Sequence, residues 1–247
     1  AMALKEELER HGDWLFKWRS YLPLLILPVV VVALKDFEYL ERVFGDTIDD
    51  LWQGFCIIVS LSGLVIRCIT VGYVPKETSG RNTKRQKAES LNTTGMYSIV
   101  RHPLYLGNFF IMLGAASFIE VWWLTLISVL SFWLYYERII IAEEEFLRRK
   151  FENVYVDWSG KTPAFLPRFR NWQKPELPFS FKAVAAREYT TLFVIIASFS
   201  FMDITGDIFV EGKLDLAWAA VFIAGVILYS TLRILKKKTK ILNVEGR

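Results

Sequence analysis

Histidine and cysteine are scarce in this chain, which contains two of each among its 247 residues. They do not show the spacing of a zinc-binding motif, so we predict no zinc, haem or other metal site. The two cysteines, Cys56 and Cys68, lie twelve positions apart in one apolar run. If this run is a helix, their separation is about 18 Å, which is too long for a disulfide bond.

Targeting signals and repeats are also missing. No small-residue cleavage site follows the first apolar run, so we expect no signal peptide. Internal repeats and low-complexity tracts are absent from the sequence. The net charge is only +4, and nucleic acid is not among the predicted partners.

Long hydrophobic runs are what the chain does contain, and 53% of its residues are hydrophobic. Runs of this length predict transmembrane helices. We therefore predict an all-α, polytopic membrane protein with about six transmembrane helices in a single domain, residues 1–247. The two-residue link 119–120 requires the third and fourth helices to form a tight antiparallel hairpin. The predicted spans are 21–34, which contains two prolines and is expected to kink, 51–74, 104–118, 121–141, 189–204 and 216–235.

The parts outside the spans predict an orientation. Residues 1–20 carry Trp14 and Trp18 on one helix face, which is typical of an interfacial helix. Residues 51–170 form the predicted core, and 171–247 add two C-terminal transmembrane helices. Lysine and arginine are concentrated in the N-terminal segment, in loops 75–103 and 142–188, and in the C-terminal tail. The positive-inside rule therefore places both termini and both large loops in the cytoplasm.

A polar cluster at the mouth of the third span is the strongest functional signal. The stretch 91–114 reads LNTTGMYSIVRHPLYLGNFFIMLG, and a cationic cluster at a membrane helix indicates a functional site. A second polar group, Glu143 and Glu144, follows the fourth span. Because the hairpin brings these groups together, we predict a cytoplasmic cofactor pocket between them. The amphipathic helix that follows Glu144 would cap this pocket.

These residues resemble the isoprenylcysteine carboxyl methyltransferase and phospholipid methyltransferase family of integral membrane enzymes. The family pattern is Gly-x-Tyr, then Arg-His-Pro-x-Tyr-x-Gly, then Glu-Glu-x-x-Leu-x-x-x-Phe-Gly-x-x-Tyr-x-x-Tyr and Pro-x-x-x-Pro. This chain departs from the pattern at Glu152, which replaces a glycine, and at Trp158, which replaces a tyrosine. The resemblance covers residues 51–167 and leaves out the N-terminal helix and the last two spans.

The resemblance implies that S-adenosyl-L-methionine is the cofactor and that a methyl group is transferred in line, so positioning is the main task. Arg101 or His102 would meet the cofactor's carboxylate or adenine edge, and the two glutamates its ribose hydroxyls and ammonium. Glycines would let the backbone approach the ligand. The cofactor-binding residues that the resemblance implies are Gly95, Tyr97, Arg101, His102, Pro103, Tyr105, Gly107, Asn108, Glu143 and Glu144.

The acceptor is predicted from the loop before this motif, which is rich in cations and hydroxyls, as a phosphate site would be. We expect O-methylation of a membrane-lipid phosphate, with Arg81, Arg85 and Arg101 as catalytic residues that neutralise it. The loop also resembles the lipid A phosphate methyltransferase branch of the family, which implies a bacterial inner membrane. Basic loop residues are further expected to contact anionic lipid head groups.

Several alternatives stay open. The acceptor could instead be a prenylcysteine carboxylate or a phosphatidylethanolamine amine. An NADPH-dependent membrane reductase would carry a similar Arg-His-Pro motif, and a non-enzymatic scaffold is a third interpretation.

Two local expectations concern polar groups inside the spans. Arg67 is expected to extend to the interface rather than to face a polar site. Tyr135 and Tyr136 are expected to form part of an aromatic belt.

Overall fold

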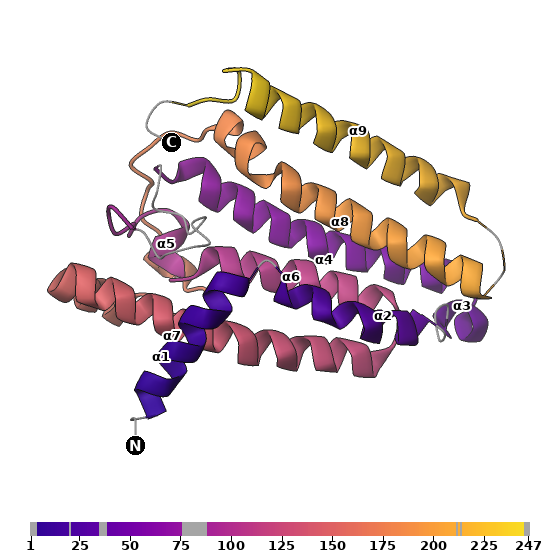
Figure 1. The fold of residues 1–247 in the computed structure, drawn as a ribbon, viewed down its shortest axis with the longest axis horizontal. Coiled ribbons are helices and arrows are strands. Elements are labelled where there is room, and N and C mark those ends of the chain that lie inside the picture. The colour runs from indigo at the N-terminus through magenta and orange to yellow at the C-terminus, as the bar shows by residue number, and fades with distance from the viewer. Residues whose placement is uncertain are drawn as a thin grey trace.

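The computed structural model describes residues 4–19, 21–34, 39–75, 88–210, 212 and 214–244, and within them it contains helices and no strands. The elements pack side by side in one bundle, with the N-terminal helix lying across it (Figure 1). In chain order they are α1 (Leu4–Trp18), the 3₁₀ helix η1 (Leu22–Ile26), α2 (Leu27–Ala33), α3 (Tyr39–Phe44), α4 (Asp46–Tyr73), α5 (Met96–Ile99), α6 (Pro103–Phe118), α7 (Trp122–Lys161), the 3₁₀ helix η3 (Phe169–Asn171), α8 (Phe181–Val210) and α9 (Leu216–Lys238).

Four of the described helices, α4, α7, α8 and α9, are long and apolar enough to cross a membrane. The apolar helix α6 has 16 residues, so it extends about 24 Å against a hydrocarbon core of about 30 Å. The all-α membrane fold is therefore confirmed, but the predicted number of six spans is not.

The first predicted span, residues 21–34, contains two short helices. Its first part is the five-residue η1, and its second part is the seven-residue α2. Each begins with a proline in its first turn. Proline has no backbone N–H and cannot continue a helix from the preceding turn, although it starts one readily. η1 continues directly into α2 with helical φ and ψ at Ile26 and Leu27, so the helix type changes within the span.

The predicted hairpin between the third and fourth spans is present as α6 and α7. The chain reverses at Glu120, whose φ of 65° is in the left-handed region. The Glu120 carboxylate accepts a hydrogen bond from the backbone N–H of Leu40 at 2.7 Å. The turn therefore also holds the first turn of α3.

Helices α4 and α6 approach closely because glycines face each other across them. A Cβ atom built on Gly107 would lie 2.7 Å from the carbonyl oxygen of Gly63, which is closer than real Cβ atoms come. One turn further along, the Ser60 hydroxyl donates to the carbonyl of Ile111 at 2.8 Å. Small residues at such a seam allow two backbones to pack without intervening side chains.

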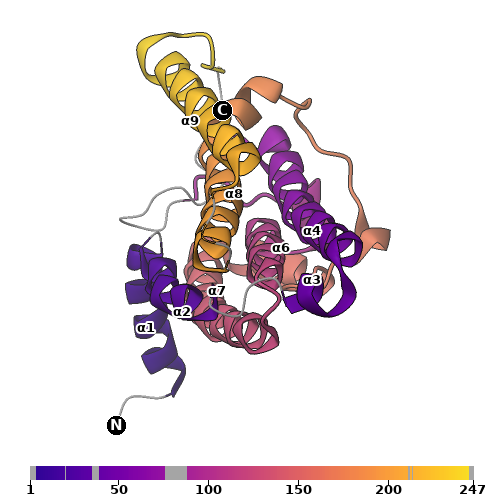
Figure 2. The ribbon, with the colours of Figure 1, turned by 90° about the vertical axis from the view of Figure 1, so that its right-hand side faces the viewer.

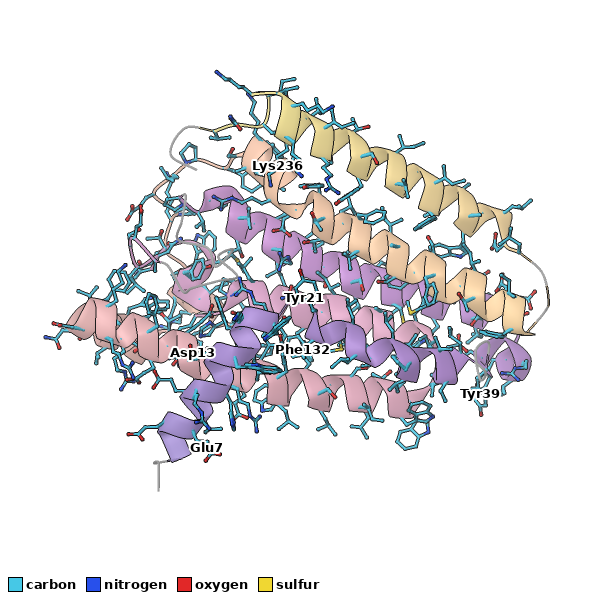
Figure 3. All side chains as sticks on the ribbon, in the orientation of Figure 1. Glu7, Asp13, Tyr21, Tyr39, Phe132 and Lys236 are labelled. Atoms are coloured by element: carbon cyan, nitrogen blue, oxygen red, sulfur yellow. The ribbon has the colours of Figure 1, made fainter. Side chains whose placement is uncertain are left out.

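The C-terminal helices differ in how deeply they are packed. Ile195, Phe199 and Met202 of α8 belong to the main hydrophobic core together with Phe118 of α6, and Figure 2 shows α8 beside α4 and α6. Of α9, all of which is described, only Gly225 is buried. Near the end of α9, Lys236 donates to the carbonyl of Ala186 at 2.7 Å (Figure 3).

The predicted amphipathic helix after the fourth span lies in the distal part of α7, which consists of two helices joined at a kink at Glu152. Together they run for 40 residues, about 60 Å, so α7 extends well beyond a membrane. One residue inside it, Glu152, is non-helical, with φ 45° and ψ −120°. This residue occupies the position where the family pattern has glycine.

Candidate active site

The two predicted polar groups meet where α6 begins beside α7. Arg101 and His102 lie between α5 and α6, and Pro103 occupies the first turn of α6, where its missing N–H needs no partner. Glu143 and Glu144 lie on α7, just past its apolar part. The hairpin geometry therefore brings together residues that are about 40 positions apart in the sequence.

Glu144 binds both cationic candidates, one with each carboxylate oxygen. Its Oε2 accepts a hydrogen bond from Nη1 of Arg101 at 2.8 Å. Its Oε1 lies 3.0 Å from Nε2 of His102, a ring that is 7% exposed. At this distance a protonated Nε2 donates to the carboxylate. Charge-assisted hydrogen bonds of this kind are the strong ones, so the three side chains form one rigid unit.

Glu143 faces a second set of partners. Its carboxylate accepts a hydrogen bond from the Tyr105 hydroxyl and lies 3.8 Å from Nδ1 of His102. Nη1 of Arg19 lies 3.9 Å from its other oxygen. The imidazole of His102 is thus held between two carboxylates, and it stacks on the Tyr105 ring with centroids 5.7 Å apart.

A layer of polar residues lies directly below this site, inside the bundle. Asn108 of α6 donates from Nδ2 to the Tyr136 hydroxyl at 2.9 Å and accepts from Nη1 of Arg67 at 2.6 Å. The Tyr136 ring contacts Tyr105, with centroids 4.7 Å apart. Arg67 in turn forms an ion pair with Glu188 of α8 at 2.8 Å. This layer supports the site from the membrane side.

Two predictions about this layer were wrong. Arg67 faces a polar site inside the bundle instead of extending to the interface, because Glu188 supplies a buried counter-charge. Tyr136 is not part of an aromatic belt: its hydroxyl is a hydrogen-bond acceptor inside the bundle. The presence of polar residues within predicted apolar spans was the available signal. The sequence could not show which of these polar residues contact one another.

The chain after α7 turns back and binds the motif through its backbone. The N–H of Arg101 donates to the carbonyl of Pro163 at 2.9 Å, and the N–H of Gly95 donates to the carbonyl of Gln173 at 2.9 Å. Trp158, which replaces the family tyrosine, donates from Nε1 to the carbonyl of Tyr97 at 3.0 Å. The segment 158–173, which follows the glutamates, therefore holds the segment 95–101 in position.

For three of the predicted cofactor-binding residues, the structure shows a conformational, packing or burial property that does not depend on a cofactor. Gly95 adopts a φ of 59°, which favours glycine. Gly107 lies against α4, so helix packing also requires a residue without a side chain. Burial raises the pKa of the Tyr97 hydroxyl above its usual range, so this group stays neutral at physiological pH. Their cofactor-binding roles remain predictions.

The predicted catalytic residues Arg81 and Arg85 lie outside the described residues. Of the three predicted catalytic arginines, the candidate site therefore contains Arg101.

Elsewhere, carboxylate oxygens of Asp203, Asp207 and Asp215 lie within 4.8 Å of one another near the α8–α9 turn. Asp215 caps α9 by accepting from the backbone N–H of Ala217 and of Trp218. This acidic group is separate from the Arg101–Glu144 site.

Comparison with known proteins places these motifs in a family. The family model described as phospholipid methyltransferase matches residues 51–154. Protein-S-isoprenylcysteine O-methyltransferase B of Arabidopsis thaliana is 30% identical over 151 residues, which cover 56% of this chain and 72% of that protein. The chain belongs to the isoprenylcysteine carboxyl methyltransferase and phospholipid methyltransferase family.

Other proteins match shorter parts of the chain. Protein-S-isoprenylcysteine O-methyltransferase of Schizosaccharomyces pombe is 34% identical over 85 residues, or 34% of this chain and 36% of that protein. The nickel-cobalt-cadmium resistance protein NccN of Alcaligenes xylosoxydans xylosoxydans is 35% identical over 121 residues, or 49% of this chain. The chain spans about half of that protein's length, 54%. No solved structure matches the chain significantly.

Family membership implies S-adenosylmethionine as the methyl donor, and the side chains present fit it. The donor's amino-acid part carries one carboxylate and one ammonium, and the site offers the Arg101 guanidinium and the His102 imidazole beside two carboxylates. Nε of Arg101 is buried, and the guanidinium interacts with the hydroxyl of Tyr155 as well as with Glu144. A guanidinium carries a positive charge and several donors, so Arg101 suits an anionic ligand group.

Proposed function

We propose that this protein is an integral membrane methyltransferase that uses S-adenosyl-L-methionine. The Glu144 carboxylate that bridges Arg101 and His102 beside Glu143 carries this proposal. The bound donor would supply an electrophilic methyl group. Arg101 and His102 would hold its carboxylate or adenine edge, and the two glutamates its ammonium and ribose hydroxyls, so that the methyl group is oriented for in-line transfer.

The proposed acceptor is an anionic oxygen on a molecule with an apolar tail. The site lies at the end of the apolar part of the α6–α7 hairpin, which suits a substrate that stays in the membrane. A phosphate or a carboxylate is already ionised at neutral pH, so its methylation requires alignment and cations but no general base. Of the three predicted catalytic residues, Arg101 is the one that the structure describes, and its guanidinium lies at this position.

A lipid phosphate is our first assignment, and the sequence of the loop with Arg81 and Arg85 supports it. A prenylcysteine carboxylate is the second candidate, because two relatives bear the name protein-S-isoprenylcysteine O-methyltransferase. A bacterial inner-membrane location with cytoplasmic termini accompanies the first assignment. The distribution of lysine and arginine along the chain supports this orientation.

The test is a methyl-transfer assay with isotopically labelled S-adenosylmethionine and the purified chain in lipid nanodiscs. The acceptors are a phosphorylated lipid such as lipid A, N-acetyl-S-farnesylcysteine and phosphatidylethanolamine, and mass spectrometry locates the added methyl group. Methylation of the phosphate supports the first assignment. Methylation of farnesylcysteine alone replaces it with the second, and methylation of the amine alone contradicts an anionic acceptor.

A cofactor-binding control addresses the reductase alternative. Thermal denaturation is measured with S-adenosylmethionine, with its demethylated product S-adenosylhomocysteine and with NADPH. Stabilisation by either of the first two compounds is the expected result. Stabilisation by NADPH alone, with no methyl transfer to any acceptor, would overturn the proposed function.

A further inference from the structure

The N-terminal helix α1 lies tightly across α7 instead of standing apart at the membrane surface. The crossing can be followed in Figure 1, and Asp13 marks α1 near it in Figure 3. A Cβ atom on Gly12 would collide with the carbonyl oxygen of Arg138 and would lie 2.8 Å from Cβ of Ala142. Outside the crossing, Glu9 forms an ion pair with Arg149 at 2.9 Å. The predicted interfacial helix is therefore also an integral part of the bundle.

The end of α1 contacts residues of the candidate site directly. Phe16 is 4% exposed and packs in one cluster with Tyr105 and Ile139. The guanidinium of Arg19 stacks over the Phe16 ring, 4.0 Å from its centroid. From there Nη1 of Arg19 lies 3.9 Å from Oε1 of Glu143, and both side chains are less than one-fifth exposed.

This contact matters because Glu143 and Glu144 are adjacent carboxylates in one partly buried site. Two negative charges on adjacent residues repel each other, which disfavours ionisation of both carboxyl groups at the same time. Glu144 pairs with Arg101 and His102, whereas among the described residues Glu143 lies 3.8 Å from the imidazole and 3.9 Å from the Arg19 guanidinium. Partial burial reduces the screening of this pair by solvent. Burial raises the pKa of Glu143, and the Arg19 guanidinium directly after α1 opposes this effect by favouring the charged carboxylate.

We propose that Arg19 is a positioning residue of the methyl-donor site, which acts by holding the Glu143 carboxylate in place to receive the donor's ammonium or ribose hydroxyls. The region that matches the family model begins at residue 51, so Arg19, directly after α1, comes from outside the matched region. The inference rests on the proposed use of S-adenosylmethionine. The docked helix α1 is then part of the binding site and not only a membrane anchor.

The experiment is isothermal titration of S-adenosylhomocysteine into the full chain in detergent, with each variant also checked by thermal denaturation without ligand. Arg19→Gln is expected to bind about tenfold more weakly than the unsubstituted chain, and Arg19→Lys to recover much of this loss because it restores the charge. Arg10→Gln, which removes an exposed charge from the same helix, is the matched control and should bind normally. In a transfer assay with saturating acceptor, Arg19→Gln should raise KM for the donor and leave kcat nearly unchanged.

A second variant tests the role of the docked helix independently. Gly12→Leu prevents the close crossing of α1 over α7, so it should weaken binding as much as Arg19→Gln, and the two substitutions together should cause little further loss. Unchanged affinity in Arg19→Gln would overturn the inference, as would a loss that Arg19→Lys does not recover. If the unsubstituted chain binds neither the donor nor its product, the proposed function itself fails, and the two failures are thereby distinguished.

Discussion

Arg67 on α4 and Glu188 on α8 form a two-point ion pair across the bundle. Nε donates to Oε2 at 2.8 Å and Nη2 donates to Oε1 at 3.1 Å, and the Glu188 side chain is 4% exposed. The remaining terminal nitrogen of Arg67 donates to Asn108 on α6. One arginine therefore connects three helices, and it joins α8, which lies outside the region matched by the family model, to α6, which begins at the proline of the Arg-His-Pro motif.

Replacing Glu188 with leucine should destabilise the protein strongly. Removing one partner of a buried ion pair leaves an unpaired charge, at a loss of about 3–5 kcal/mol. Thermal denaturation in detergent would show this as a lower midpoint. The double variant Arg67→Met with Glu188→Leu is the control, and it should recover much of the loss because no charge is left unpaired. A single Glu188→Leu variant as stable as the original chain would contradict the prediction.

Gly107→Ala should weaken the α4–α6 contact. The new Cβ would lie 2.6 Å from Cγ of Arg67 and 2.7 Å from the Gly63 carbonyl oxygen, so the helices must separate, with an expected loss of about 1–3 kcal/mol. The matched control is Gly54→Ala on α4, where the Cβ meets nothing within 4 Å. That variant should be unchanged or slightly stabilised, because alanine is the better helix former. Equal stability of both alanine variants would argue against a glycine seam.

Glu152→Gly should stabilise the protein. Glutamate at φ 45° is strained, and glycine adopts such a conformation readily, so we expect a gain of about 1 kcal/mol. Glu152→Ala separates the two contributions, because it removes the carboxylate but retains the Cβ atom that causes the strain. The denaturation midpoints of the two variants are compared. If Glu152→Ala raises the midpoint as much as Glu152→Gly does, the gain results from removing the charge and not from relieving backbone strain.

Glu144→Gln should weaken the binding of S-adenosylhomocysteine by at least about tenfold, since hydrogen bonds to charged groups contribute about 1.5–3 kcal/mol. The substitution removes the charge that orients Arg101 and His102 together. Isothermal titration measures the change. Glu145→Gln is the control on the same helix, because Glu145 pairs with the exposed Arg149 at 3.4 Å and not with the motif. If both variants lose affinity equally, general electrostatics and not the bridging geometry would explain the effect.

The sequence by itself determined the membrane class, the α6–α7 hairpin and the pairing of the motif with Glu144. These features depend on local properties. Apolar runs predict helices in a membrane, and a link of two residues leaves only one way for two helices to pack. The hairpin then brings Arg101 beside Glu144 whatever the other helices do.

Only the tertiary structure decided the partners of Arg67, Tyr136 and Arg19. Arg67 and Glu188 lie 121 positions apart, and their contact depends on how α8 packs beside α4. The approach of α6 to α4 at Gly63 and the crossing of α1 over α7 at Gly12 are likewise set by side-chain shape on two surfaces at once. Hydropathy specifies which residues enter the bundle, but the rotation and depth of each helix, which decide which polar groups meet, result from the packing of all the helices together.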